Sequence, residues 1–163
     1  MSYDLSDLLD VREFLISVDY VYNESDDHNV GTRDLAHSMS LYLRVDTGVW
    51  GFRSDLSGGV GYHEQGDLIG IALMPFYSLA KTIQVVGRYT FIHSFEDGGI
   101  RFARYEDRIG TDRGEEYDEV YVGFNWYIYG HKLKLQTGFK YTWMDTDRNY
   151  RGWGWTSGFR MYW

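Results

Sequence analysis

Two His-Ser neighbours are the residues of this chain whose types could support nucleophilic chemistry. His37 precedes Ser38 and His93 precedes Ser94, and a serine next to a histidine base is the arrangement used by hydrolases that form an acyl-enzyme. The base must reach the nucleophile by a hydrogen bond, whereas neighbouring residues of a β-strand point to opposite faces. No third group at a recognisable spacing would orient either histidine. We therefore expect these residues to be ordinary polar side chains, and the protein not to be an enzyme.

Clustered carboxylates are the second set of residues with possible chemistry. They occur at Glu24–Asp27, Glu115–Asp118 and Asp145–Asp147, and carboxylate oxygens are ligands that calcium prefers. None of these runs has the full alternation of a calcium loop with its closing Glu. The chain has no Cys, which excludes thiol catalysis, disulfide frameworks and cysteine-based zinc sites. The sequence therefore predicts solvated acidic loops, and no metal or cofactor.

Composition narrows the class of protein further. The 163 residues include 16 Lys and Arg against 24 Asp and Glu, a net charge of −8, and the basic residues are scattered, so we expect no nucleic-acid partner. The longest apolar stretch, Leu68 to Tyr77, is interrupted by Gly70 and Pro75. It is shorter than the roughly 18 residues that a membrane-spanning helix needs. The acidic start of the chain has no apolar run typical of a signal peptide.

A hydrophobic period of two dominates the chain and predicts antiparallel β-strands. It recurs in segments of about ten residues that are separated by clusters of Gly, Asp, Asn and Ser. In the first segment, for example, Ile16, Val18 and Tyr20 alternate with Ser17 and Asp19. The eight expected strands are 14–23, 38–46, 50–63, 68–78, 83–94, 119–128, 133–143 and 153–163, of which 68–78 has the weakest alternation.

The lengths of the connections alternate as well. Tight links at 47–49, 79–81 and 129–131 alternate with longer polar links, the longest at 23–37 and 95–118. Short periplasmic turns and longer extracellular loops are typical of outer-membrane barrels. We therefore expect an all-β fold, a transmembrane antiparallel up-and-down β-barrel of eight strands over residues 13–163. The amphipathic residues 1–12 are expected to form an N-terminal periplasmic tail or a short helix.

The position of the charges favours a lipid-facing exterior over a soluble barrel. In a soluble eight-stranded barrel the apolar side chains fill the interior. Here charged residues share the face opposite to the apolar one, and we expect them to line the interior, either as a narrow polar conduit or as a closed network of ion pairs. This interior set comprises Asp19, Arg44, Asp46, Arg53, Asp55, Arg88, Glu119, Lys140 and Arg160.

Large aromatic residues near the segment ends fit the two girdles of a membrane barrel, where they anchor the chain at the membrane interfaces. We expect this role for Trp50, Tyr62, Tyr89, Trp126, Trp143, Trp155 and Trp163.

Three runs in the second half of the chain carry a resemblance to a known family. They are Val86–Tyr89, Tyr121–Tyr127 and His131–Gln136, the last leading to Tyr141. In this order they resemble the C-terminal strands of the phosphate-selective porin O and P family of outer-membrane channels. The closing segment, with Phe159, Met161 and Trp163, is similar to the terminal signal read by the barrel-assembly machinery.

The resemblance implies the bacterial outer membrane as location and the lipid bilayer and the assembly machinery as partners. Members of the family have about sixteen strands or more, so this chain resembles their C-terminal half. The acidic excess provides no ladder of Lys and Arg, and the family's phosphate selectivity is not carried over.

The sequence therefore predicts a porin-like barrel that passes small ions or solutes passively through a narrow polar interior. The first alternative is a non-conducting barrel that serves as an anchor, adhesion surface or scaffold, with an interior filled by side chains. A second is a homo-oligomer in which two chains form one larger barrel. A soluble ligand-binding barrel is the remaining alternative.

Overall fold

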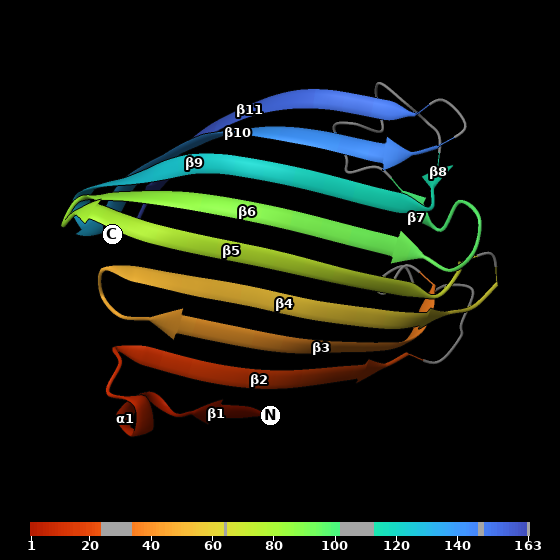
Figure 1. The fold of residues 1–163 in the computed structure, drawn as a ribbon, viewed down its shortest axis with the longest axis horizontal. Helices are drawn as coiled ribbons and strands as arrows, with labels where there is room; N and C mark the ends of the chain where they lie inside the picture. Colours follow the sequence, from red (N-terminus) through yellow and green to blue (C-terminus); the bar gives the residue numbers. More distant parts are fainter. Residues whose placement is uncertain (24–33, 64, 102–112, 147–148, 163) are drawn as a thin grey trace.

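Nine strands form one antiparallel sheet in chain order (Figure 1). The structure is a computed structural model, and it describes residues 1–23, 34–63, 65–101, 113–146 and 149–162. The order of the strands is β1-β2-β3-β4-β5-β6-β9-β10-β11, and each strand is antiparallel to its neighbours. The strands of the sheet are β1 (Ser2–Asp4), β2 (Glu13–Tyr22), β3 (Leu35–Asp46), β4 (Trp50–Gly61), β5 (Leu68–Ala80), β6 (Ile83–Ser94), β9 (Glu116–His131), β10 (Leu133–Asp145) and β11 (Tyr150–Met161).

The all-β, up-and-down architecture expected from the sequence is confirmed, and each of the eight expected segments overlaps one long strand. The sheet differs from the expected barrel at its margins. In the described part of the chain it begins at β1 and ends at β11, and β2 and β11 do not pair, so the sheet is open. One physical reason is local: β1 occupies the outer edge of β2, where a closing strand would lie.

The N-terminal segment contains both a strand and a single helical turn. After β1, α1 spans Ser6–Leu9. Asp4 accepts hydrogen bonds from the backbone N–H and the hydroxyl of Ser6, and these bonds hold the pKa of the Asp4 carboxyl below its usual value. The Ser6 hydroxyl in turn accepts a hydrogen bond from the Phe14 N–H at 2.8 Å. Within the described residues, no helix is long and apolar enough to cross a membrane.

The connections between the long strands sort by length onto the two ends of the sheet. At the end we call the short-turn end, β3, β5 and β9 are followed by turns at 47–49, 81–82 and 132. Thr47 closes the first of these turns by donating its N–H to the Trp50 carbonyl at 2.9 Å, while Gly48 takes a φ of +90°. The connection from β1 to β2, which contains α1, lies at the short-turn end as well. The connections from β2 to β3, β4 to β5, β6 to β9 and β10 to β11 lie at the long-connection end (Figure 1). The two longest include residues 24–33 and 102–112, which lie outside the described residues.

Cross-strand pairing gives the sheet two chemically different faces. Residues directly opposite each other in an antiparallel pair share a face, so the register can be followed from strand to strand. The polar face carries the series Asp19, Ser40, Ser57, Gly70, Ile92 and Tyr117. The apolar face carries the series Val18, Leu41, Leu56, Ile71, Phe91 and Asp118.

Few apolar side chains of the described chain are fully buried. Among the described residues, only Ile100 and Met144 are buried hydrophobic side chains, at 5% and 2% exposure. Ile100 belongs to β7 (Ile100–Arg101), which pairs with β8 (Arg113–Gly114). The two side chains pack against Leu68, Ile92, Tyr117 and Tyr150 at the long-connection end of the polar face. The apolar face has no comparable cover from the described chain.

We expect Met144→Ala to lower the free energy of unfolding by about 2–4 kcal/mol, because it empties a buried site. Met39→Ala, at a 58% exposed position, is the matched control and should cost less than about 1 kcal/mol. Urea titration of the refolded protein measures both values. Equal losses would contradict the placement of this small core.

Candidate functional site

The polar face gathers the whole set of residues that the sequence predicts for an interior. The register places all nine on this face, spread over seven strands. They are Asp19, Arg44, Asp46, Arg53, Asp55, Arg88, Glu119, Lys140 and Arg160. Period-two patterning therefore located the face of every member, although it did not indicate which members would be in contact.

Glu119 is the centre of the strongest network on this face. It is 5% exposed, and its carboxylate accepts hydrogen bonds from Arg88, and from the Lys140 ammonium at 3.1 Å. The Tyr117 hydroxyl donates at 3.0 Å and the Thr142 hydroxyl lies at 3.5 Å. These partners come from β6, β9 and β10, which lie side by side. Two cations and two hydroxyls thus compensate one buried carboxylate, as a charge removed from bulk water requires.

A ladder of neutral amides lies nearer the short-turn end. Gln84, Asn125 and Gln136 are directly opposite one another on β6, β9 and β10. The Gln84 side-chain oxygen accepts from the Asn125 amide at 3.0 Å and from the Tyr127 hydroxyl at 3.1 Å. The Gln136 amide donates to the Asn125 side-chain oxygen at 2.7 Å. The sequence analysis missed this ladder because it considered only the charged residues of the polar face. Each of the three amides nevertheless alternates in phase with the polar-face charged residues of its own strand.

The charges on the polar face are divided across the sheet. On β2, β3 and β4 it carries four carboxylates and two guanidinium groups: Glu13, Asp19, Asp46, Asp55, Arg44 and Arg53. On β6, β9, β10 and β11 it carries four cations and one carboxylate: Arg88, Lys134, Lys140, Arg160 and Glu119. The margin at β2 is therefore acidic and the margin at β11 is basic.

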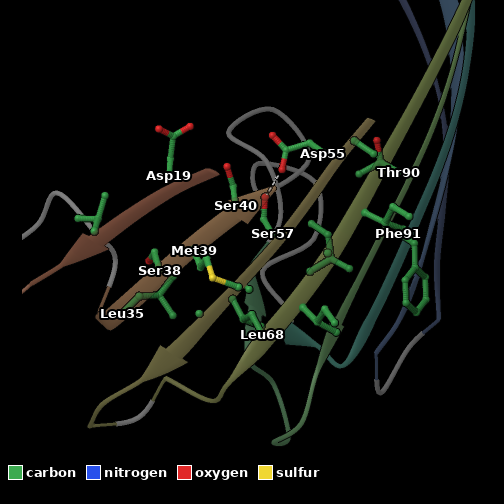
Figure 2. Close-up of a pocket in the computed structure, with 18 residues that line it drawn as sticks. Asp19, Leu35, Ser38, Met39, Ser40, Asp55, Ser57, Leu68, Thr90 and Phe91 are labelled. Atoms are coloured by element: carbon green, nitrogen blue, oxygen red, sulfur yellow. Dashed lines mark hydrogen bonds between the residues drawn. The ribbon is translucent and has the colours of Figure 1, made fainter. Parts of the chain in front are cut away.

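Two hollows lie along the sheet. The first, with a volume of about 490 Å³, has a floor of small residues on β3, β4 and β5, including Ser40, Ser57 and Gly70. Figure 2 shows Asp19, Ser40 and Asp55 projecting to the same side at its border. The second hollow, about 540 Å³, is lined by Arg53, Arg88, Lys134 and Lys140 together with the amide ladder. The side chains of the polar face therefore leave space between them.

Of the aromatic residues expected at membrane interfaces, the register places Trp50, Tyr89, Trp126, Trp143 and Trp155 on the apolar face. Trp50 begins β4 and Trp126 is in the last third of β9, towards the short-turn end. Tyr62 follows β4 and Trp143 is near the end of β10, towards the long-connection end. Tyr89 and Trp155 lie near the middle of β6 and β11 rather than at their ends. Trp163 lies outside the described residues.

The residues of the expected assembly signal lie on the last strand. Phe159 and Met161 are on the apolar face of β11, opposite Leu135 and Leu133. Their side chains are 71% and 62% exposed, so they are accessible along the outer margin of the sheet.

The His-Ser neighbours are separated as strand geometry requires. The ring Nδ1 of His37 makes a hydrogen bond to the Tyr20 hydroxyl at 2.8 Å on the apolar face. Ser94 is buried on the polar face and donates to the Glu96 carbonyl at 2.7 Å. His93 contacts the ring of Phe95 edge-on. Across the described ranges, no group of three His, Cys, Asp or Glu side chains could hold a metal ion.

The fold and the site define a class: an all-β protein with a large antiparallel up-and-down sheet, one face charged and the other apolar. Comparisons with protein-family models, with curated proteins and with solved structures found no match. The resemblance to the porin family therefore remains an expectation from the sequence.

We expect Glu119→Gln to lower the free energy of unfolding by about 3 kcal/mol, because it leaves Arg88 and Lys140 without the anion that they share. Glu13→Gln removes the partner of Arg44, 2.9 Å away, where both side chains are about 30% exposed. This control should cost less than about 1 kcal/mol. Urea titration measures both losses, and a Glu119 variant as stable as the Glu13 variant would contradict a central role for the network.

Proposed function

We propose that this chain forms the wall of an outer-membrane β-barrel, with its apolar face against lipid and its polar face lining a passage for small ions or polar solutes. The observation that carries the proposal is the exposed apolar face. Val18, Leu41, Leu56, Val122 and Phe139 lie on it, on five different strands, and each is more than 40% exposed.

A face of this kind needs an apolar cover. Burying apolar surface is worth about 25 cal/mol per Å², and contiguous apolar surfaces of this extent mark interaction or membrane sites. Strands β2 to β6 and β9 to β11 have 10 to 16 residues. About 9–11 tilted residues cross the hydrocarbon layer, so the strands are long enough for a bilayer to be that cover.

The polar face supports an aqueous lining. Its charged side chains could not be accommodated against lipid, and the hollow lined by Arg53, Arg88, Lys134 and Lys140 leaves room for water and small solutes. Short turns at one end and long connections at the other match the periplasmic and extracellular ends of such barrels.

A second candidate is a non-conducting barrel that serves as an anchor or scaffold. The Glu119 network and the cluster around Ile100 favour it, because both fill part of the polar face with contacting side chains. The two candidates share the membrane and differ in conduction.

Conductance distinguishes the two candidates. After refolding in detergent and insertion into a planar bilayer, we expect discrete conductance steps. Arg53→Gln should change their size or ion preference, because Arg53 lines the larger hollow, whereas Val122→Ala on the apolar face should not. A folded and silent protein would exclude the passage and favour the scaffold.

A charge scan tests the membrane itself. Val122→Arg should destabilise the protein in lipid vesicles by about 2–4 kcal/mol, because it moves a charge into hydrocarbon. Thr156→Arg, at an exposed position of the polar face, should cost less than about 1 kcal/mol. The readout is the free energy of unfolding in vesicles. If Val122→Arg instead left the protein stable and soluble without detergent, lipid would not be the cover of this face.

A further inference from the structure

At the two margins of the sheet, many backbone N–H and C=O groups have no partner strand in the described chain. In the described chain β11 pairs with β10 alone, so one side of its 12 residues has no strand partner. Unpaired backbone groups cost several kcal/mol each in hydrocarbon, where water cannot replace the partner. A wall that lies in a bilayer therefore needs a strand along this margin.

The opposite margin carries a short substitute strand. Met1 and Val18 exchange backbone hydrogen bonds of 2.7 and 2.8 Å, and the Leu5 N–H donates to the Phe14 carbonyl at 2.8 Å. Between these bonds, β1 covers β2 for three residues, all of them exposed. The rest of the edge, Asp19 to Tyr22, has no outer strand in the described chain. Short exposed strands of this kind protect an edge from unwanted pairing.

β1 occupies the position that a β11 strand would take. Both β1 and an incoming β11 would run antiparallel to β2, because β11 ends and β2 begins at the short-turn end. The polar face carries the even-numbered residues of β11 and the odd-numbered residues of β2. Pairing that keeps this face continuous therefore sets even-numbered β11 residues opposite odd-numbered β2 residues. Arg160 then lies near Glu13, and the basic margin meets the acidic margin.

We propose that a second copy of this chain supplies the missing strand: β1 leaves the β2 edge, and β11 of each copy pairs with β2 of the other. The proposal rests on the proposed function, and its partner is the chain itself. A twofold axis along the barrel makes two identical contacts between β11 of one copy and β2 of the other, which we call seams. Such head-to-tail contacts close into a ring. The product is one sixteen-stranded barrel.

The hollows favour this closure over pairing of β11 with β2 of the same chain. An eight-stranded barrel has an interior just wide enough to be filled by side chains. This sheet instead holds a hollow of about 540 Å³ beside the long side chains of Arg53, Arg88, Lys134 and Lys140. The other hollow, of about 490 Å³, lies over small residues of β3, β4 and β5. Closure of one copy would have to eliminate that space, whereas sixteen strands leave an aqueous channel.

A reversible lock tests the exchange of β1. Ser2 and Ser17 are directly opposite each other. The neighbouring pair, Met1 and Val18, is hydrogen-bonded, and the two kinds of pair alternate along an antiparallel ladder, so Ser2 and Ser17 form a non-hydrogen-bonded pair. Residues in such pairs lie at a distance that a disulfide can span. The chain has no other Cys. Ser2→Cys/Ser17→Cys in detergent should have the mass of one copy when oxidised and of two copies when reduced, by light scattering.

The matched control places a disulfide between two inner strands of the sheet, β3 and β4. Ser40→Cys/Ser57→Cys joins two other directly opposite residues and should stay dimeric in both redox states. A Ser2/Ser17 variant that is dimeric when oxidised, or monomeric when reduced, would overturn the proposal.

Cross-linking identifies the strands of the seam. Chains with Ser17→Cys are refolded together with chains with Thr156→Cys or Gly158→Cys, the latter a position where a Cβ meets no atom within 4 Å. We expect a disulfide between two copies for at least one of these pairs. No cross-link for either pair, or an internal cross-link in a single chain carrying both cysteines, would overturn the proposal.

These readouts are separate from those of the proposed function. A chain that is sensitive to Val122→Arg in vesicles but stays monomeric would retain the membrane function and exclude the second copy. A dimer with seam cross-links that does not enter vesicles would exclude the membrane function and retain the seam.

Discussion

The structure depends on one constraint, which is that the alternation of side chains stays in phase across eight long strands. A slip of one residue between two strands would move every charged residue of one strand to the apolar face. The described register contains three irregularities, at Leu35/His37, Ser78/Ala80 and Leu133/Lys134. Each lies at the end of a strand, so none changes the phase in the middle of the sheet. The separation of charged and apolar surface follows from this placement.

Pro75 shows how the sheet tolerates a residue that is rare in central strands. Proline has no N–H to donate, and central strands rarely contain it. In β5 the pairing with β6 is interrupted between Leu73 and Phe76, while pairing with β4 continues through Phe52. Gly87 of β6 lies against the proline ring, where an added Cβ would be 3.5 Å from the ring. A small neighbour thus accommodates Pro75, and the strand runs on to Ala80.

Local patterns predicted the elements well, because period two and turn residues are properties of neighbouring positions. The segment 68–78 had the weakest alternation, since Gly70, Ala72 and Met74 are not polar, yet it forms a full strand. What the sequence did not predict depends on partners distant in the chain. The pairing of β1 with β2, the packing of Ile100 against Met144, and the amide ladder each require a register that only the folded sheet defines. The open margins belong to the same group, because period two does not determine whether a first and a last strand meet.

The position of the tryptophans gives the protein a built-in optical reporter. All five that the structure describes, Trp50, Trp126, Trp143, Trp153 and Trp155, lie on the apolar face. Indole emission depends on the polarity of its surroundings, so the emission of these five side chains reports on the apolar face of the sheet. The medium in contact with that face therefore sets their emission wavelength, and no added label is needed.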